Sequence, residues 1–256
     1  MVSKERDSLE FEGKVAIITG GARGIGKATA LEFSKNGAAV VIVDVLEKEL
    51  KAVGEMIQKM DKKALPLKGD VSDNGQIQEV IKKTIDHFGK IDILINNAGV
   101  GDVMGPVVNT SEEDWDRVLR INLKSVFLFC KGVVPFMMKN KKGSIVNIAS
   151  LAGKEGNENM APYSVSKAGI ICLSRVLAKE VVKDGIRVNS IAPALIKTDF
   201  TSIPPKEVIN TLIAKIPLGR MGNPEEIANV ILFLCSDKAS FVTGQCYNVS
   251  GGRGDY

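Results

Sequence analysis

Short runs of consecutive apolar residues recur along this 256-residue chain, and longer stretches with helical periodicity separate them. A strand that is apolar without alternation is buried on both faces, as in a parallel sheet covered by helices on each side. With 45% hydrophobic residues, the chain can bury a substantial core in one α/β domain. We therefore predict a doubly wound parallel sheet of about seven strands, at 15–19, 39–43, 64–67, 91–95, 144–149, 187–191 and 246–249.

Helical periodicity fills the gaps between these runs. No Pro/Ser-rich linker, low-complexity tract or internal repeat interrupts the chain, so residues 1–256 are predicted to form a single domain. Residues 1–12 are expected to be an N-terminal extension, and 194–218 a loop region next to the substrate. The clearest helices are expected at 24–36, 74–88, 111–139, 162–183 and 224–234.

The first apolar run, VAIIT, breaks into GGARGIG and then into a helical pattern. Gly20, Gly24 and Gly26 have the spacing G-x-x-x-G-x-G, in which glycine permits positive φ and lets backbone N–H groups approach a pyrophosphate. A glycine-rich turn alone is weak evidence. Here a strand precedes it and a helix follows, which is the context typical of dinucleotide binding.

The second apolar run ends in Asp44, about twenty residues past the glycine turn. A carboxylate at this place can hydrogen-bond a ribose diol, and it would repel a 2′-phosphate. Asp44 therefore favours NAD over NADP. Arg23 leaves NADP open, because a guanidinium beside the turn could reach a 2′-phosphate.

Tyr163 and Lys167 stand four residues apart in APYSVSKAG, and Ser150 closes the apolar run SIVNIAS. On a helix, residues i and i+4 share a face, so the ammonium can lie beside the phenol. A charge pair about 4 Å apart is worth roughly 4 kcal/mol at an effective dielectric of about 20, enough to lower a tyrosine pKa by about three units. The pair could act as a general base near neutral pH, although the same spacing also occurs on ordinary solvated helix faces.

The composition argues against several other classes of protein. Basic and acidic residues, 34 and 30, are interspersed, so neither nucleic acid nor a membrane is expected as the main partner. The N-terminus lacks an apolar signal region and no apolar run reaches membrane-spanning length, which predicts a cytoplasmic location. The four cysteines are scattered and His87 is the single histidine, so no metal site, disulfide or Ser-His-Asp hydrolase is expected.

Taken in order, these motifs resemble the short-chain dehydrogenase/reductase family, which has a Rossmann fold. The resemblance runs from about residue 13 to residue 252. The motifs that carry it are TGGARGIG at 19–26, Asp44, Asp70-Val71, NNAG at 96–99, Asn122 in RINLKS, Ser150 and Tyr163-x-x-x-Lys167.

The resemblance assigns roles to residues of this chain. Ser150 would hydrogen-bond the substrate oxygen and Tyr163 would exchange its proton, while Lys167 would lower the pKa of Tyr163 and hold the ribose hydroxyls. Asn122 would position a water next to Lys167. The implied catalytic residues are Asn122, Ser150, Tyr163 and Lys167. The implied cofactor-binding residues are Gly20, Arg23, Gly24, Ile25, Gly26, Asp44, Asp70, Val71, Asn97, Ala98, Gly99, Tyr163, Lys167, Pro193, Ile196 and Thr198.

One position departs from the family pattern. The family usually has Pro-Gly where this chain has Pro193-Ala194. Alanine cannot take positive φ cheaply. Either Ala194 keeps an ordinary backbone conformation, or the loop that follows moves differently from the family norm.

The substrate is less clear from the sequence. The segment 151–162 is rich in polar groups, among them Lys154 and Glu155, which suits a polyhydroxylated substrate. Its AGKEGN stretch and the C-terminal VSGGRGDY are similar to family members that oxidise sugars or sugar acids with NAD. The alternative is a 3-oxoacyl carrier-protein reductase, a branch that typically uses NADP and needs a basic patch for an acidic carrier. Lys141, Lys142 and Lys179 could provide that patch.

Two further expectations concern assembly and catalysis. Family members are usually homotetramers or homodimers, paired through the helices expected here at 111–139 and 162–183. A non-catalytic NAD sensor or scaffold is the alternative of a different class. Intact catalytic positions weigh against it, so the sequence predicts an NAD-dependent oxidoreductase acting on a secondary alcohol or ketone.

Overall fold

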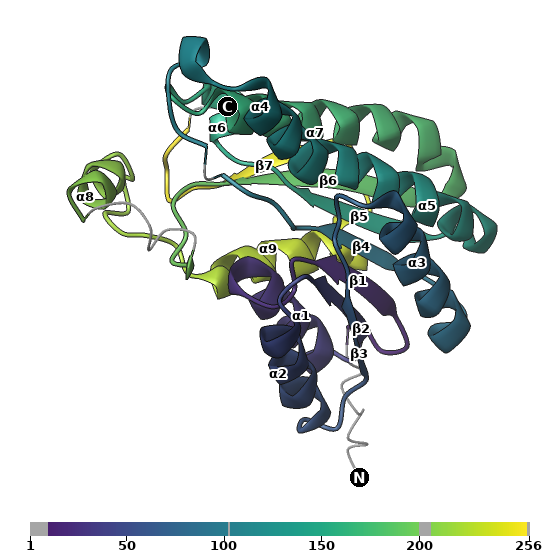
Figure 1. The fold of residues 1–256 in the computed structure, drawn as a ribbon. Helices are drawn as coiled ribbons and strands as arrows, with labels where there is room; N and C mark the ends of the chain where they lie inside the picture. The colour runs from purple at the N-terminus through teal and green to yellow at the C-terminus, as the bar shows by residue number, and fades with distance from the viewer. Residues whose placement is uncertain (1–9, 102, 200–205, 255–256) are drawn as a thin grey trace.

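The computed structural model describes residues 10–101, 103–199 and 206–254 (Figure 1). In this part of the chain seven parallel strands form one sheet, in the order β3-β2-β1-β4-β5-β6-β7. The predicted doubly wound parallel sheet is confirmed. Its strands are β1 (Val15–Thr19), β2 (Ala39–Asp44), β3 (Ala64–Lys68), β4 (Ile93–Asn96), β5 (Gly143–Ile148), β6 (Ile186–Pro193) and β7 (Cys246–Val249).

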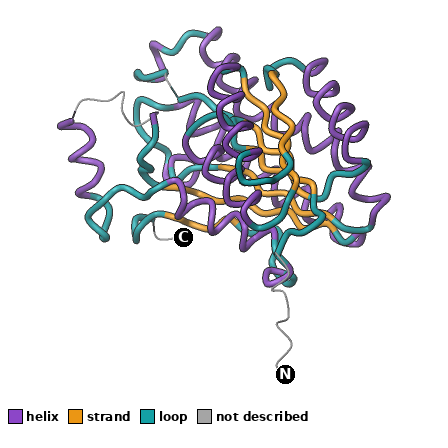
Figure 2. Tube along the Cα trace, turned by 90° about the horizontal axis from the view of Figure 1, so that it is seen from below, coloured by secondary structure: helices purple, strands orange, loops and turns teal. Residues whose placement is uncertain are grey.

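Helices cover both faces of the sheet, as the ribbon and the view from below show (Figures 1 and 2). One face carries α1 (Gly24–Lys35), α2 (Glu47–Gln58) and α9 (Pro224–Cys235). The other carries α3 (Asn74–Phe88), α5 (Ser125–Asn140) and α7 (Ala161–Val181).

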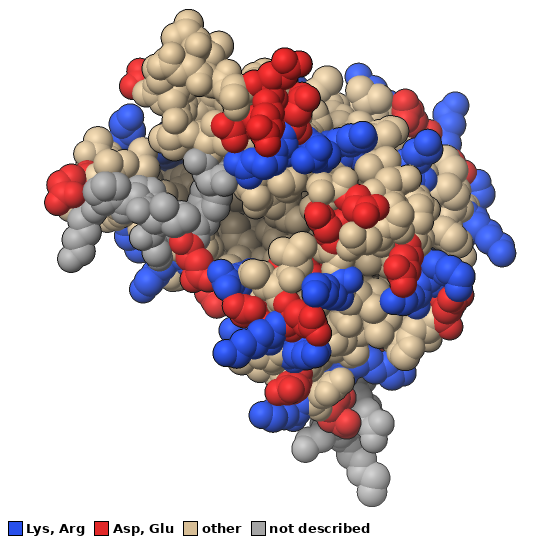
Figure 3. All heavy atoms as spheres, viewed as in Figure 1, with Lys and Arg blue, Asp and Glu red and all other residues tan. Residues whose placement is uncertain are grey.

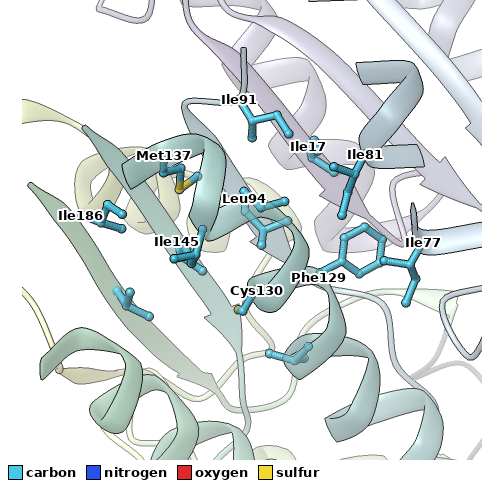
Figure 4. Close-up of a cluster of buried hydrophobic side chains, with 14 of the residues drawn as sticks. Ile17, Ile77, Ile81, Ile91, Leu94, Phe129, Cys130, Met137, Ile145 and Ile186 are labelled. Carbon is cyan, nitrogen blue, oxygen red and sulfur yellow. The ribbon is translucent and has the colours of Figure 1, made fainter. Parts of the chain in front are cut away.

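Alternate side chains of the central strands point to opposite faces of the sheet and pack in two separate cores. In β1, Val15 and Ile17 join the core under α3, α5 and α7, whereas Ala16 and Ile18 join the core under α1, α2 and α9. Figure 4 shows the first core, where Phe129 of α5 lies beside Ile77 of α3. Because both faces of each central strand are buried, its sequence reads as an unbroken apolar run.

Local sequence signals define several helix boundaries. Asp73 caps α3 by accepting hydrogen bonds from the amides of Gly75 and Gln76. Asn223 and Glu226 form a capping box at the start of α9, where Pro224 occupies the first turn.

The expected N-terminal extension at 1–12 needs a correction at its end. Residues 1–9 lie outside the described part of the chain. Phe11, however, is only 2% exposed and packs edge-to-face on Phe33 of α1, with ring centroids 4.9 Å apart. The core therefore begins before residue 13.

Two segments that were not expected to be helical contain helices. The region 194–218 includes α8 (Lys206–Ala214), which projects from the body in Figure 1, and residues 200–205 of it are outside the described residues. The polar segment 151–162 begins with the short helix α6 (Ala152–Glu155). The helix α6 has only four residues, too few to show a period, whereas Val208, Ile209, Leu212 and Ile213 give α8 a helical apolar spacing that is visible in the sequence.

The long helix predicted at 111–139 consists of α4 (Glu112–Leu119), the π-helical turn η2 (Arg120–Lys124) and α5. Within the described residues, Glu112–Asn140 is long and apolar enough by length and composition alone to cross a membrane, and 44% of its most apolar stretch is buried in the protein. Val126, Phe129 and Val133 of this helix lie in the core. Packing against the sheet accounts for its apolar character.

Candidate active site

The expected site residues gather at the carboxyl edge of the sheet. Gly20 follows β1, Asp44 ends β2, Ser150 follows β5 and Pro193 ends β6. The strand order reverses between β1 and β4, and ligands of open α/β sheets bind outside the strand ends at such a switch point. Figure 3 shows a hollow on this side of the molecule, among interspersed acidic and basic side chains.

The glycine turn is packed so tightly that side chains are excluded from it. A Cβ atom on Gly26 would lie 2.0 Å from the carbonyl oxygen of Gly20, and one on Gly24 would lie 2.9 Å from Cγ2 of Thr198. Gly20 and Gly24 have φ of +64° and +49°. Within the described residues no side-chain hydrogen bond caps α1 at its N-cap residue Arg23, so the amides of its first turn are available to a phosphate.

Thr19 and Asn97 join this turn to the end of β4. The hydroxyl of Thr19 accepts hydrogen bonds from the amides of Asn97 and Ala98, at 3.0 and 3.1 Å. The side chain of Asn97 donates to the carbonyl oxygens of Thr19 and Gly20, both at 3.0 Å. Thr19 was not among the expected site residues, although its place at the end of an apolar run next to the glycines is a usable signal.

The carboxylate of Asp44 is fixed by two backbone amides. It accepts hydrogen bonds from the N–H groups of Ala22 and Leu46, both at 3.1 Å. A carboxylate has about four acceptor positions, so capacity remains for a ribose diol.

Arg23 lies beside Asp44 but has acidic partners of its own. Its guanidinium donates to Glu49 and lies 3.6 Å from a carboxylate oxygen of Asp199. The hydrogen bond to Glu49 is the main cause that raises the pKa of Arg23. A cavity of about 440 Å³ at this place is lined by Ala22, Arg23, Gly24, Lys27, Glu49, Ala52, Val53 and Asp199.

Three of the expected cofactor-binding residues, Asp70, Val71 and Ile25, differ in how far their side chains are buried. Asp70 is half-buried, and its carboxylate accepts a hydrogen bond from the amide of Ser72. Val71 is only 9% exposed and its side chain packs with Ile77 and Val80 in the core. Ile25 is half-buried and packs on the other core. Val71 can therefore present little more than its backbone to a cofactor, whereas part of the Ile25 side chain is accessible.

Ser150, Tyr163 and Lys167 come together as expected. A hydrogen bond joins the hydroxyls of Ser150 and Tyr163. Lys167 is 4% exposed, and its Nζ donates to the carbonyl oxygen of Ile148 at 2.8 Å. Nζ lies 5.7 Å from the centre of the Tyr163 ring.

The protonation properties of this trio differ from the expectation that Lys167 lowers the pKa of Tyr163. Burial raises the pKa of Tyr163, and the hydrogen bond with Ser150 opposes that shift. Burial also lowers the pKa of Lys167 to about 8. Desolvation penalises the charged form of each group and is the largest effect on both.

Asn122 lies in the π-helical turn η2 and is fully buried. Its side chain exchanges hydrogen bonds with both backbone groups of Val100, at 2.8 Å each, and donates to the hydroxyl of Ser166 at 3.1 Å. A Cβ atom on Gly99 would lie 3.2 Å from Oδ1 of Asn122 and 3.4 Å from Nζ of Lys167. Asn122 and Lys167 thus border the same point of the site.

The segment after β6 closes over the glycine turn. Ile196 is buried, and residues 195–197 hydrogen-bond Gly222. Thr198 contacts the position of Gly24. Ala194 has a negative φ. Of the two alternatives expected for this position, it therefore keeps an ordinary backbone conformation.

The polar segment after Ser150 is tied to the C-terminus of the chain. Lys154 donates to the carbonyl oxygen of Cys246 at 3.4 Å, and Glu155 forms an ion pair with Arg253 at 3.0 Å. Arg253 is another residue that sequence reasoning missed, because the residues that pair are almost a hundred positions apart.

Two of the three lysines considered for a carrier-binding patch, Lys141 and Lys142, are partly neutralised by acidic neighbours. Lys141 pairs with Asp184, and Lys142 lies 3.1 Å from a carboxylate oxygen of Asp237. Each neighbouring carboxylate reduces the attraction that the patch could exert on an acidic partner.

The glycines, the uncapped start of α1 and Asp44 fit a dinucleotide, and the trio beyond them fits proton transfer at a substrate oxygen. Fold and site define a Rossmann-type oxidoreductase. Residues 20–253 match the family model described as enoyl-(acyl carrier protein) reductase, and the chain belongs to the short-chain dehydrogenase/reductase family. It is an oxidoreductase that acts on hydroxyl and keto groups with a nicotinamide cofactor. Among the described residues, no group of three or more His, Cys, Asp or Glu is arranged to hold a metal.

Similar proteins cover nearly the whole chain. The 3-oxoacyl-[acyl-carrier-protein] reductase of Thermotoga maritima is 44% identical over 245 residues, which are 95% of this chain and 99% of the relative. A (2S)-[(R)-hydroxy(phenyl)methyl]succinyl-CoA dehydrogenase subunit of Thauera aromatica is 42% identical, covering 96% of this chain and 98% of the relative. The crystal structure of levodione reductase superposes with a TM-score of 0.92 at 34% identity, covering 94% of this chain and 98% of that one.

Proposed function

We propose that this protein interconverts a 3-oxoacyl thioester and its 3-hydroxyacyl form with NAD(H). The hydrogen-bonded Ser150 and Tyr163 next to buried Lys167 carry the proposal for the chemistry. Relatives at 39–44% identity that are named for 3-oxoacyl or acyl-CoA substrates support the substrate class.

The surroundings of the site also favour an acyl substrate over a sugar. The amide of Gly105 donates to the carbonyl oxygen of Asn159, which ties the segment 103–109 to the chain just before α7. Met104, Val107 and Val108 of this segment are 65%, 70% and 90% exposed. They offer an apolar rim for an acyl chain. Two of the groups expected to meet a sugar, Lys154 and Glu155, are engaged by the C-terminal part of the chain.

In the proposed reaction, Ser150 donates a hydrogen bond to the substrate oxygen. Tyr163 gives its phenolic proton to that oxygen during reduction and takes it back during oxidation. The nicotinamide cofactor, when bound, supplies or accepts the hydride. Lys167 holds the ribose hydroxyls. It exchanges protons with solvent through a water that Asn122 positions.

We propose NAD rather than NADP because of the charges near Asp44. Two backbone amides fix its carboxylate where the ribose diol is expected, and Glu49 and Asp199 surround the guanidinium of Arg23. A 2′-phosphate would meet this group of carboxylates, whereas a ribose diol can donate hydrogen bonds to Asp44.

A substrate panel tests the substrate class. Purified protein is assayed with NADH and NADPH against 3-oxoacyl-coenzyme A, the same acyl group on carrier protein, and ketoses, and with NAD against aldoses and sugar acids. We expect the highest kcat/KM with a thioester and NADH. A higher kcat/KM with a sugar would contradict the acyl proposal, and NADPH preference would contradict the cofactor proposal.

Tyr163→Phe tests the chemistry apart from the substrate. It removes the proton donor and keeps the ring, so turnover should fall by at least about a hundredfold, the least that a general acid usually contributes. Dinucleotide affinity should stay nearly unchanged by fluorescence titration. A variant that keeps a tenth of the wild-type rate would contradict the role of Tyr163.

We also propose a cytoplasmic homodimer or homotetramer. Support comes from the outer side of the long helix, where a groove of about 560 Å³ is lined by Asp116, Leu119, Arg120, Leu123, Lys124 and Phe127. Phe127 is 46% exposed there. Analytical ultracentrifugation of the protein and of Phe127→Asp tests this assembly: a monomeric wild type, or a variant with unchanged mass, would contradict it.

A further inference from the structure

The hydroxyl of Ser166, a residue between Tyr163 and Lys167 in the chain, links two parts of the candidate site. It donates to the backbone carbonyl of Tyr163 at 2.7 Å and accepts from the side-chain amide of Asn122 at 3.1 Å. Ser166 and Asn122 are both fully buried. The two hydrogen bonds connect the turn of α7 that carries the acid/base to the π-helical turn η2.

Asn122 depends on this contact for its orientation. Its two amide hydrogens go to the carbonyl oxygen of Val100 and to Ser166, and its Oδ1 accepts from the amide of Val100. Without the Ser166 hydroxyl, one amide hydrogen would be left unpaired away from water. The amide would then turn toward another acceptor. Oδ1 borders Gly99 beside Nζ of Lys167, so this movement would reach the proton path.

We propose that Ser166 is a positioning residue of the hydride-transfer reaction, which acts on the proton path of Tyr163 by holding Asn122 beside Lys167. The inference rests on the proposed function of those three residues. It assigns Ser166 an effect on the proton-transfer step and none on dinucleotide binding. A π-helical turn at Asn122 agrees with a functional constraint, since such turns are frequent at functional sites.

Ser174 of the same helix is a matched control. It is also fully buried, donates to the carbonyl oxygen of Ile170 at 2.7 Å and accepts from the side-chain amide of Asn147 at 2.9 Å. Its partner Asn147 bonds Asn96 inside the core. The two serines thus have the same chemistry and burial, and they differ in whether the amide they hold belongs to the site.

The test compares Ser166→Ala with Ser174→Ala for Tm, NAD affinity, kcat, KM and the solvent deuterium isotope effect. Both variants should lose Tm to a similar extent. Ser166→Ala should lower kcat about tenfold, which is part of the rate enhancement that acid–base catalysis supplies. It should also raise the solvent isotope effect. Its NAD affinity should stay within about twofold of the wild-type value. Ser174→Ala should keep kcat within about twofold. Equal kcat values and isotope effects for the two variants would overturn the proposal.

Further variants distinguish the role of Ser166 from the proposed function on which it rests. If Ser166 acts through Asn122, Ser166→Ala should not lower kcat further in an Asn122→Ala background, and additive losses would overturn the proposal. Should Ser166→Ala fail to fold, Ser166→Cys retains a weaker donor and acceptor, and its kcat should fall below wild type with a raised isotope effect. An active Tyr163→Phe variant would instead overturn the proposed function itself.

Discussion

The two walls of the candidate site are built in different ways. The dinucleotide wall consists of backbone: glycines that exclude a Cβ atom, and amides at the start of α1 and around Asp44. The substrate wall depends on side chains from distant parts of the chain, such as Arg253 on Glu155 and Lys154 on Cys246.

This difference indicates how one fold can serve many substrates. A backbone-built wall tolerates few changes, because nearly any added atom collides with another strand end. A wall made of long side chains on a short helix and the C-terminal segment can change its shape and charge through single substitutions, while the sheet stays as it is. The following predictions test this contrast, from the largest expected effect to the smallest.

Gly26→Ala should damage the dinucleotide wall most. The new Cβ would lie 2.0 Å from the carbonyl oxygen of Gly20 and 2.6 Å from Nδ2 of Asn97. We expect a loss of about 3 kcal/mol in the free energy of unfolding, as for overpacking, and loss of measurable NAD binding. Denaturant unfolding and fluorescence titration measure these. Gly75→Ala, in the first turn of α3, should cost less than Gly26→Ala, because its Cβ would meet only Oδ1 of Asp73, at 3.2 Å. Equal effects of the two substitutions would refute the backbone account.

Lys167→Met should change how stability depends on pH. Burial lowers the pKa of Lys167 from 10.5 to about 8, so below pH 8 the folded protein bears the full cost of a buried ammonium, of the order of 3 kcal/mol. As pH rises from about 8 toward 10.5, the folded state loses this proton before the unfolded state does, and stability rises.

The variant lacks this titration. Relative to Lys167→Met, the wild type should therefore gain unfolding free energy between pH 8 and pH 9.5, a range that ends below the tyrosine titration near pH 10. Urea unfolding at several pH values measures the difference. A constant difference over this range would show that Lys167 is not desolvated.

Asp44→Ala should alter the cofactor preference. Removing the carboxylate takes away the acceptor for the ribose diol and a charge that repels a 2′-phosphate, so the ratio of kcat/KM for NAD to that for NADP should fall about tenfold or more. Steady-state kinetics with both cofactors measures the ratio. Asp73→Ala, which removes the cap of α3, should leave the ratio unchanged. A similar shift in both variants would rule out a specific role for Asp44.

Arg253→Ala should have the smallest effect, confined to the substrate wall. The Arg253 side chain is 14% exposed and that of Glu155 33%, so the pair is expected to hold α6 in place without adding much stability. We expect the KM for substrate to rise about threefold, with kcat and NAD affinity nearly unchanged, in line with an effect of less than 1 kcal/mol.

Two controls isolate this contact. The charge-reversed variant Arg253→Glu/Glu155→Arg should restore most of the KM, whereas Lys82→Ala, which removes an exposed ion pair on α3, should leave all kinetic constants unchanged. An unchanged KM in Arg253→Ala would mean that the C-terminal segment does not shape the substrate wall.

Much of the fold was predictable because its signals are local. Strand 15–19 and the start of α1 at Gly24 were predicted to the residue, since an apolar run and a glycine turn are each visible within a few positions. Ser150 and Asp44 were placed at the site for the same reason: each follows or ends a buried strand.

Most errors concern features that depend on contacts between residues far apart in the sequence. Phe11 was assigned to an N-terminal extension, but it packs against Phe33 of α1 in the core. α8 is a different kind of error, because the helical spacing of Val208, Ile209, Leu212 and Ile213 is visible within the region 194–218, which was predicted to be a loop. The effect of Lys167 on the pKa of Tyr163 was inferred from spacing, and spacing does not report that burial shifts both groups against their charged forms.

The sequence alone determined the parallel sheet, the dinucleotide turn and the order of the polar residues at the strand ends. These follow from the chain's own periodicity and from glycine's lack of a side chain, which act over a few residues. Tertiary structure decided which polar atoms meet: Asn122 with Ser166, Glu155 with Arg253, Arg23 with Glu49 and Asp199. It also decided how far Lys167 is desolvated. Such pairings depend on distance and burial in the folded chain. The sequence therefore shows which polar residues are present but not which of them contact one another.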